Sequence, residues 1–369
     1  HQQKKAMRKM SWCVWLATTA FNASRAFQQL ASVGGRKRSL SSSSLGSSAK
    51  KTVFIDGEAG TTGLQVYDRL ARHPDVDVVS LPAEQRKDTA KRKEALNSVD
   101  AVVLCLPDAA AIEAVALIEN EDVKVVDAST AHRCSAEWAY GFPEMTKMQR
   151  ERIKKSKRVA NPGCYATGYL SLTRPLTDAG LMGHMEKLAC TAISGYSGGG
   201  KALCAVHEGP DHVEPWGAYG LSLDHKHLPE MRVYSRMDYA PLFLPAVGHF
   251  KQGMVVSIPL PWGDGPALHE ALAAHYADSD FVTVAPLELD ELADQGFLNR
   301  GAFLDPTKLN GSNNLDVFVF HNPDTRTAVL AARLDNLGKG ASGAAVQNIN
   351  IMLDLDEHNG LDLNLKQEE

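Results

Sequence analysis

The sequence has few cysteines, no long apolar run and little net charge, and each of these deficits excludes a class of protein. Its six cysteines are scattered through 369 residues, and no two of them form a CxxC pair. Neither a disulfide scaffold nor a cysteine zinc site is therefore expected, and a reducing compartment suits the chain. No apolar run reaches the roughly 20 residues that a membrane-spanning helix needs. A net charge of -5 gives no reason to expect a nucleic-acid partner.

Aspartate and glutamate are absent from the first 51 residues, which are basic and end in the serine-rich run SLSSSSLGSS at 39–48. This composition is typical of an organelle-targeting segment. The apolar stretch SWCVWLATTAF at 11–21 follows basic residues and resembles the core of a signal peptide. We therefore expect residues 1–50 to direct import, with a plastid (chloroplast) favoured. A mitochondrial presequence and a disordered tail are the alternatives.

The folded part opens with a strand, a glycine turn and a helix. TVFID at 52–56 is followed by GEAGTTG at 57–63 and by LQVYDRLARH, whose apolar residues have helical spacing. Glycines allow the backbone to approach a pyrophosphate, and the helix start offers it free N–H groups. The pattern predicts a dinucleotide site formed by Gly57, Gly60, Thr61, Thr62 and Gly63. Its spacing is GxxGxxG rather than GxGxxG, and an ordinary strand–turn–helix is the alternative.

The segment after the second expected strand bears on the choice of cofactor. An NAD site usually has an acidic residue about 20 residues after the glycines, which holds the ribose hydroxyls. The strand VDVVSL at 76–81 ends without one, and Arg86 and Lys87 follow. A missing acid and nearby cations favour the 2′-phosphate of NADP, although solvated loop charges would give the same pattern. Two further apolar strands, 101–107 and 123–129, flank a helical stretch and predict a parallel Rossmann-type sheet.

Cys164 is the candidate nucleophile. In RVANPGCYATG at 158–168 a strand ends at Asn-Pro-Gly, and a helix is expected to begin at or next to the cysteine. A thiol at a helix N-terminus lies in a field that favours the thiolate, which is the form that attacks an acyl centre. Cys105, Cys190 and Cys204 lie in apolar runs and are interpreted as structural.

Two histidines and a glutamate lie close together in LDHKHLPE at 223–230. Histidine is well suited to move a proton near neutral pH, so His225 or His227 can act as an acid–base partner. A metal site is the alternative, but no third ligand is identifiable beside Glu230, and hydride chemistry needs no metal. We therefore expect no metal. Two surface histidines in a polar loop would also give this pattern.

Three further segments are candidates for binding anions. SGYSGGGK at 194–201 provides backbone N–H groups at Ser197 and Gly198 and a charge at Lys201, although a flexible loop is the alternative. DASTAHR at 127–133 places Ser129 and Arg133 after a strand, where the arginine could clamp a phosphate or a carboxylate or form a structural salt bridge. NLGKGASG at 336–343 precedes a helical stretch, and we expect its Gly338, Lys339 and Gly340 to contact the nicotinamide side of the cofactor.

Nine ordered segments together resemble the N-acetyl-γ-glutamyl-phosphate reductases of the shorter, type 2 subfamily. They run from about residue 52 to 355 and read IDGEAGTTGLQ, LCLPD, DASTAHR, YGFPE, NPGCYATG, SGYSGGGK, HKHLPEM, PAVGHFKQGM and LDNLGKGASGAAVQN. The resemblance implies NADPH-dependent reduction of an acyl phosphate to a semialdehyde in arginine biosynthesis, by a homodimer or homotetramer. It matches Cys164 to the nucleophile and His225 to the acid–base residue, with Glu230 tuning the site. It also places Leu106 and Pro107 at the cofactor, and Asn161 and His227 at the substrate.

The resemblance also implies an α/β fold with two domains. We expect a Rossmann-type NADP-binding domain at 51–163 and 337–357, an α+β catalytic domain at 164–336, and a polar tail at 358–369. The nearest rival is aspartate-semialdehyde dehydrogenase, against which the HKHLPEM and SGYSGGGK segments argue. A non-catalytic NADP-binding protein and a cysteine hydrolase are rivals of other classes.

Overall fold

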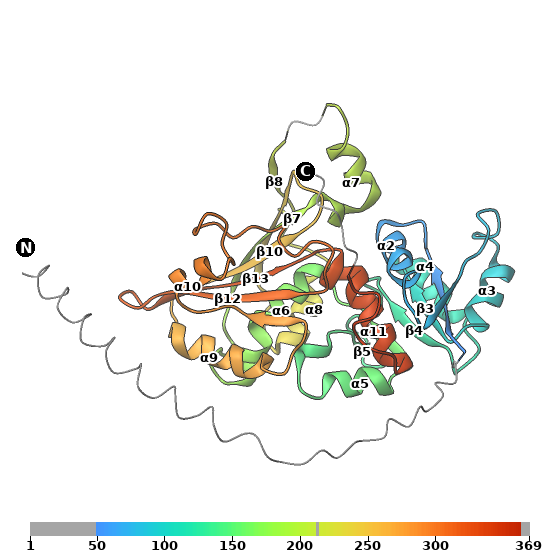
Figure 1. Ribbon diagram of the computed structural model, residues 1–369, viewed down its shortest axis with the longest axis horizontal. Coiled ribbons are helices and arrows are strands. Elements are labelled where there is room, and N and C mark those ends of the chain that lie inside the picture. The colour runs from blue at the N-terminus through green and yellow to red at the C-terminus, as the bar shows by residue number, and fades with distance from the viewer. Residues whose placement is uncertain (1–48, 212–213, 363–369) are drawn as a thin grey trace, which may run out of the picture. The chain divides into compact units, whose positions relative to one another are not determined.

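The computed structural model describes residues 49–211 and 214–362. The expected targeting segment therefore lies outside the described residues, except for its last two positions. Within the described part, two sheets are formed, and each is covered by helices (Figure 1).

The first sheet is parallel and has the strand order β2-β1-β3-β4-β6-β5. Its strands are β1 (Lys51–Asp56), β2 (Val76–Val79), β3 (Ala101–Leu104), β4 (Lys124–Asp127), β5 (Ala139–Tyr140) and β6 (Arg158–Ala160). Between them run α2 (Thr61–Leu70), α3 (Thr89–Asn97), α4 (Asp108–Ala116), the short η1 (Pro143–Met145) and α5 (Gln149–Lys155). Separate apolar clusters contain alternate residues of β1 and β3, which explains the continuous apolar runs in these strands.

The strand order of the first sheet reverses at β1. The chain continues from β1 to β2 on one side and then crosses to β3 on the other. Ligands of such sheets bind in the crevice outside the carboxyl ends of the strands at this switch point. The glycine turn at 57–63 lies there, between the end of β1 and the start of α2.

The second sheet is mixed and has the order β11-β12-β13-β10-β7-β9-β8. Its strands are β7 (Ala189–Gly195), β8 (Trp216–Ala218), β9 (Leu242–Gly248), β10 (Met254–Leu260), β11 (Val282–Val284), β12 (Leu315–Asn322) and β13 (Thr327–Leu334). Its helical elements are α6 (Cys164–Asp178), η2 (Tyr196–Gly199), α7 (Gly200–His207), α8 (Leu228–Ser235), α9 (Gly265–Tyr276) and α10 (Leu289–Asp294). Residues of α6, α8 and α9 share one apolar cluster with the central strands, so these helices cover one face of the sheet.

The chain then returns to the first sheet. After β13 come the π-helical turn η3 (Gly338–Ser342) and α11 (Gly343–Leu353). Ala345, Val346 and Ile349 of α11 pack in the same apolar cluster as residues of β1 and β3. In Figure 1 the red α11 accordingly lies beside α5 and against the strands of the first sheet. The expected architecture, a Rossmann-type α/β domain joined to an α+β domain, is confirmed.

The polar tail expected from residue 358 packs on the first domain in its first residues. Leu361 is 2% exposed and belongs to the cluster under the first sheet. The buried guanidinium of Arg69 donates a hydrogen bond to the carbonyl of Leu361, and Asn350 donates one to the carbonyl of Asn359 (2.9 Å). Three leucines among nine polar, charged or glycine residues at 358–369 were too weak a signal to indicate this docking.

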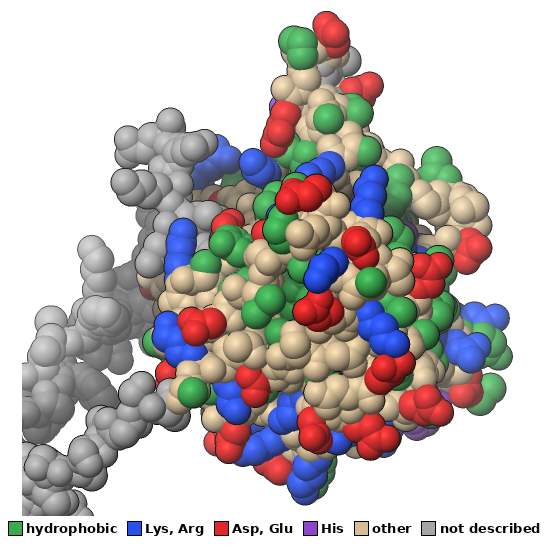
Figure 2. Space-filling model, turned by 90° about the vertical axis from the view of Figure 1, so that its right-hand side faces the viewer, with side chains coloured by type: hydrophobic (Ala, Val, Ile, Leu, Met, Phe, Trp, Pro, Cys, Tyr) green, Lys and Arg blue, Asp and Glu red, His purple; other side chains and the backbone are tan. Residues whose placement is uncertain are grey.

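The described surface carries charges of both signs. On the face in Figure 2, acidic and basic side chains are intermingled, as expected for a small net charge. No helix in the described part of the chain is long and apolar enough to cross a membrane.

Candidate active site

Cys164 is the first residue of α6, directly after the turn that ends β6. Gly163 has an extended backbone at this turn, and two groups approach it closely. A Cβ at this position would lie 2.5 Å from Nε2 of His227 and 2.6 Å from Nη1 of Arg133. A Cβ on Gly340 would lie 2.7 Å from that of Cys164. Glycine is needed at both positions because no side chain fits there.

The sequence predicted that Cys164 rests as a thiolate, but in the structure its pKa favours the protonated thiol. Burial raises its pKa to about 11, although Arg133 and the backbone N–H of Tyr165 act in the opposite direction. The helix start is present, but removing the thiolate from water outweighs its field. Cys164 is therefore protonated near neutral pH and needs a base when it attacks.

His225 and His227 both line the cavity that contains Cys164, which has a volume of about 680 Å³. Burial and the neighbouring Lys226 lower the pKa of His225 to about 4, and burial and Arg133 lower that of His227 well below its usual value. Both imidazoles are thus neutral at pH 7 and can accept a proton. The backbone N–H of His227 donates to Nδ1 of His225 (3.1 Å), which places the proton of His225 on Nε2.

Glu230 organises the turn before the nucleophile. It is buried, accepts hydrogen bonds from Nη1 of Arg133 (2.7 Å) and from the hydroxyl of Tyr140 (2.6 Å), and accepts one from the backbone N–H of Gly163 (3.1 Å). Arg133 in turn donates from Nε to the carbonyl of Asn161 (2.9 Å). Glu230 does not line the cavity, so it acts on the site through Arg133 and Gly163.

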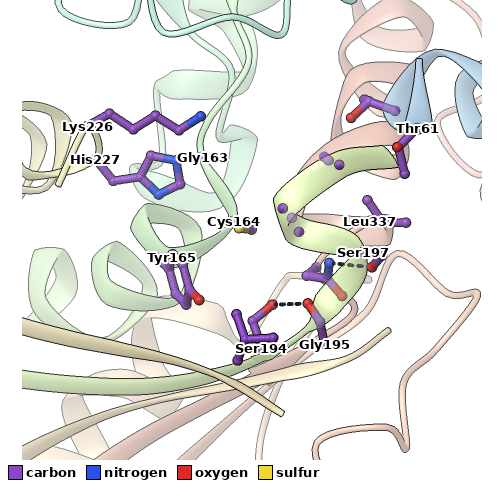
Figure 3. Close-up of a pocket in the computed structure, with 18 of the residues that line it drawn as sticks. Thr61, Gly163, Cys164, Tyr165, Ser194, Gly195, Ser197, Lys226, His227 and Leu337 are labelled. Carbon is purple, nitrogen blue, oxygen red and sulfur yellow. Dashed lines mark hydrogen bonds between the residues drawn. The ribbon is translucent and has the colours of Figure 1, made fainter. Parts of the chain in front are cut away.

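The glycine-rich segment of the second domain forms the opposite wall of the cavity. Ser194, Ser197 and Gly198 line it, together with Asn336. Asn336 donates from its side chain to the hydroxyl of Ser197 (3.0 Å), so the segments at 194–201 and 336–343 are joined at the site. Figure 3 shows Cys164 between this wall and Lys226 with His227.

The glycine turn at 57–63 forms the edge of a smaller, adjoining cleft of about 270 Å³. Gly57 has a φ of +91°, and a Cβ there would lie 2.3 Å from the carbonyl oxygen of Cys105. A Cβ on Gly63 would lie 2.3 Å from the carbonyl oxygen of Gly57. The turn is thus tight enough to bring backbone against a ligand. Thr61 and Thr62 line both cavities, so the cleft is continuous with the cavity around Cys164.

Lys201 lies on the cofactor side of the site. We predicted it at the substrate, but it lines the smaller cleft with Gly60 and Leu106 and is absent from the lining of the larger cavity. Its helix, α7, starts at Gly200 and therefore carries the lysine towards the glycine turn rather than towards Cys164.

Three other residues predicted at the cofactor, Pro107, Arg86 and Lys87, do not line this cleft. Pro107 precedes the first turn of α4 and does not line the cleft. Arg86 lies 3.5 Å from the carboxylate of Glu58 and donates to the carbonyl of Leu81 (3.0 Å). Lys87 is exposed in the same loop.

Lys339 does not contact the cofactor cleft with its side chain, so this prediction is wrong. The ammonium is 1% exposed and lies 2.8 and 2.9 Å from the two carboxylate oxygens of Glu144. It also donates to Oε1 of Gln347 (2.7 Å). Gly338 packs against the carbonyl of Ser312 and lines neither cavity. A glycine-rich helix entry does not by itself show which way its side chains face. Of the three residues, only Gly340 lines the active cavity.

Two predicted substrate residues are engaged within the protein. Ser129 donates to the buried Asp127 (2.7 Å) and is not in the cavity lining. Asn161 lines the cavity, but its side chain donates to the carbonyl of Ala341 (3.0 Å) and accepts from Asn348 (3.1 Å). Asn161 thus joins the turn before Cys164 to η3 and α11.

Sequence reasoning missed several side chains that line the active cavity, among them Tyr165, Tyr219 and Lys226. Tyr165 follows the nucleophile directly, and its hydroxyl accepts a hydrogen bond from that of Tyr219 (3.1 Å). Lys226 lies between the two histidines, so the motif that revealed them already contained it. Tyr219 had no local signal.

Known proteins match almost the whole described chain in sequence. Residues 52–156 match the semialdehyde dehydrogenase NAD-binding domain, and residues 164–336 match the semialdehyde dehydrogenase dimerisation domain. N-acetyl-gamma-glutamyl-phosphate reductase 2 of Nostoc sp. is 51% identical over 325 residues, which cover 85% of this chain and 99% of the relative. The reductase of Burkholderia cenocepacia is 50% identical over 311 residues, covering 82% and 97%.

The chain belongs to the N-acetyl-γ-glutamyl-phosphate reductase family. The resemblance inferred from the nine segments is thereby confirmed. Solved structures agree at the level of the fold. Aspartate semialdehyde dehydrogenase II of Vibrio cholerae has a TM-score of 0.61 at 15% sequence identity. The match covers 83% of this chain and 99% of the Vibrio chain. The enzyme of Candida albicans, solved with NADP, has a TM-score of 0.55 at 13% identity, covering 82% and 98%.

Proposed function

We propose that this chain is an NADPH-dependent N-acetyl-γ-glutamyl-phosphate reductase, which forms N-acetylglutamate semialdehyde and phosphate in arginine biosynthesis. One observation carries the proposal. The thiol of Cys164 shares a cavity of about 680 Å³ with two neutral histidines, and this cavity opens into a glycine-edged cleft. A nucleophile, proton acceptors and a nucleotide cradle in one continuous space fit the reductive cleavage of an acyl phosphate. Relatives that are 50% and 51% identical to this chain are named for this activity.

The cleft fits a nicotinamide cofactor. Its tight turn at Gly57 and Gly63 leaves no room for a Cβ, and the N-terminus of α2 follows at Thr61. Backbone N–H groups at such a helix start suit a pyrophosphate, with Lys201 adding a positive charge across the cleft. When bound, the nicotinamide cofactor supplies the hydride.

In the first half-reaction, Sγ of Cys164 attacks the acyl carbon. A thiol whose pKa is raised to about 11 must lose its proton as it attacks, and a neutral imidazole in the cavity accepts it. A C–S bond forms, the bond from the acyl carbon to the phosphate oxygen breaks, and phosphate leaves with that electron pair. The product is a thioester on Cys164.

In the second half-reaction, the thioester carbonyl carbon is reduced to a thiohemiacetal. The imidazolium formed in the first half-reaction can give the thiol proton to the oxygen that becomes negative and take it back as the adduct collapses, and Nε2–H of His225 can donate a hydrogen bond to the same oxygen. Collapse breaks the C–S bond, re-forms the carbonyl of the semialdehyde and returns the electron pair to sulfur. Glu230 and Arg133 hold the turn at Gly163 throughout.

A preference for NADP over NAD is supported by the loop after β2. No acidic residue ends this strand. The guanidinium of Arg86 lies 3.5 Å from the carboxylate of Glu58, which is a residue of the glycine turn. A cation beside the turn suits a 2′-phosphate. Arg86→Ala is expected to raise the KM for NADPH about tenfold or more and to leave that for NADH nearly unchanged, since one charge-assisted hydrogen bond contributes about 1.5–3 kcal/mol. Equal effects on both cofactors would contradict this preference.

The deciding assay is phosphate-dependent reduction of NADP with N-acetylglutamate semialdehyde and with aspartate semialdehyde. Cys164→Ser serves as the control, because it keeps the fold but removes the thiolate. We expect turnover of the N-acetylated substrate to be faster and to disappear in Cys164→Ser. Faster turnover of aspartate semialdehyde would reassign the chain to aspartate-semialdehyde dehydrogenase, and binding of NADP without any turnover would make it a non-catalytic binding protein.

We also propose that residues 1–50 direct import into a plastid, supported by their basic, serine-rich and acid-free composition. A fluorescent protein fused to residues 1–51 is expected to enter plastids of a photosynthetic cell; entry into mitochondria instead would select the alternative. The match of residues 164–336 to a dimerisation domain supports a homo-oligomer, a homodimer or a homotetramer, which light scattering of the purified protein would distinguish.

A further inference from the structure

Lys226 lies at the mouth of the active cavity with the two histidines on either side. The carbonyl of His225 accepts a hydrogen bond from the N–H of Leu228 (2.9 Å), so the chain turns here before α8 begins. Because of this turn, three consecutive side chains, His225, Lys226 and His227, line the same cavity. In an extended strand the middle one would point the other way. Figure 3 shows the lysine extending above His227 towards Gly163.

Lys226 is the cation among the described cavity-lining residues whose charge no carboxylate neutralises. No aspartate or glutamate occurs among the described residues that line the cavity, and only Arg133 and Lys226 carry a permanent positive charge. Arg133 is neutralised by Glu230 at 2.7 Å and donates further hydrogen bonds to the carbonyls of Asn161 and Ala128. Both histidines are neutral at pH 7 because their pKa values are lowered.

The ammonium of Lys226, in contrast, has no carboxylate within salt-bridge distance in the described part of the chain. Asp108 is the carboxylate whose pKa it helps to lower, but Asp108 accepts hydrogen bonds from the N–H (2.9 Å) and the hydroxyl of Thr130. Asp108 also lies outside the cavity lining. The positive charge of Lys226 is therefore available to a ligand in the cavity.

We infer that Lys226 binds the phosphoryl group of the acyl phosphate, and the inorganic phosphate of the reverse reaction, beside the nucleophile. The inference rests on the proposed function. A phosphate dianion that enters a cavity without acidic residues gains most from the one cation that is not already paired. A group that leaves from the carbon attacked by Cys164 must lie next to that thiol, and Lys226 lines the same cavity and extends towards Gly163, the residue before the nucleophile.

The semialdehyde substrate also has a carboxylate, and a lysine could bind this group instead. The reverse reaction separates the two, because phosphate and aldehyde are added as different molecules. Lys226→Met keeps the length of the side chain and removes its charge, whereas Lys226→Arg keeps the charge. Lys157→Met is the matched control: this exposed lysine pairs with Asp122 (3.4 Å) and lines no part of the cavity.

The first measurement is the KM for phosphate in the phosphate-dependent reduction of NADP. We expect Lys226→Met to raise it about 10- to 100-fold, the range that loss of one hydrogen bond to a charged group produces. The KM for the aldehyde should stay within about twofold, Lys226→Arg should recover most of the loss, and Lys157→Met should behave like the wild type. An unchanged KM for phosphate overturns the inference. So does a rise in the KM for the aldehyde alone, which would place the carboxylate at Lys226.

The second measurement needs no turnover. Phosphate bound beside Cys164 should slow its alkylation by iodoacetamide, measured by mass spectrometry of the peptide that contains it. We expect the alkylation rate without phosphate, divided by the rate with phosphate, to exceed one in the wild type. In Lys226→Met this ratio should approach one. Equal protection in both proteins overturns the inference. If phosphate protects the wild type but N-acetylglutamate semialdehyde is not turned over, the phosphate site stands and the proposed function fails.

Discussion

The buried ion pair between Lys339 and Glu144 allows a test of how the segment that returns after β13 is held on the first domain. Glu144 belongs to the first domain and Lys339 to the turn η3 beside Cys164, and both side chains are at most 2% exposed. Lys339→Met removes the charge and leaves the carboxylate buried without its partner. Loss of one member of a buried pair costs about 3–5 kcal/mol, a large part of the roughly 5–15 kcal/mol that stabilises a typical domain.

Adding Glu144→Leu to Lys339→Met should recover part of this loss. The remaining polar neighbour, Gln347, keeps its hydrogen bonds from Asn313 (2.8 Å) and to Glu357 (2.7 Å), so the double variant leaves no buried charge and no orphaned amide. We therefore expect the double variant to be more stable than Lys339→Met alone. Equilibrium unfolding in urea, followed by tryptophan fluorescence, measures all three proteins.

Two outcomes would refute this reasoning. One is a loss below about 1 kcal/mol for Lys339→Met, since that is the range of an exposed pair. The other is a double variant whose loss equals the sum of the single losses, which would mean that the two side chains do not interact. The affinity for NADPH should change little, because the ammonium faces Glu144. A large loss of affinity at unchanged stability would restore the cofactor contact expected from the sequence.

The pair also predicts a direction for the pH dependence of stability. The Lys339 ammonium and the amide of Gln347 hold the pKa of Glu144 below its usual value, despite burial. A carboxyl group with a lowered folded-state pKa stabilises the fold above its unfolded pKa, and this contribution is lost as the pH falls through the folded value. The stabilities of the wild type and of Lys339→Met should therefore converge on acidification. If the difference between their free energies of unfolding stayed constant at pH values below the folded-state pKa of Glu144, the stabilising role of the ion pair would be contradicted.

Three further predictions concern the nucleophile and its neighbours. Because burial raises the pKa of Cys164 to about 11, its alkylation rate should rise about tenfold per pH unit between about pH 7 and 10; a plateau near the ordinary thiol pKa of about 8.5 would contradict this. His225→Asn should lower kcat more than His227→Asn, and the reverse order would move the acid–base role to His227. Gly163→Ala should lower kcat about 100-fold while the protein remains folded by circular dichroism, since its Cβ would meet His227 at 2.5 Å; near-normal turnover would show that the turn tolerates a side chain.

Local signals in the sequence were sufficient for much of the fold and part of the site. The expected strand, turn and helix are formed, with the helix at 61–70 rather than 64–73, because glycine spacing and apolar periodicity are properties of neighbouring residues. The start of a helix at Cys164 follows from the turn before it. In contrast, the pKa of Cys164 depends on how deeply the thiol is buried, which no local pattern encodes.

Other features were beyond the reach of sequence reasoning for the same reason. Lys339 and Glu144 are 195 positions apart, so nothing local shows that the lysine faces a carboxylate rather than a cofactor. Lys201 follows a glycine run that suits an anion, but which cavity it enters depends on the direction of α7. Tyr219 lines the active cavity from a segment without any motif.

The sequence by itself determined which reactive groups this protein carries: a cysteine at a helix start, two histidines separated by one residue and a glycine turn after a strand are recognised from residue type and spacing. Tertiary structure alone decided which of these groups share a space. It placed Lys226 in the cavity of Cys164, Lys201 in the neighbouring cleft and Lys339 in the core. The reason is physical: the field and the solvation that a charged group experiences come from residues brought near by folding, whatever their separation along the chain.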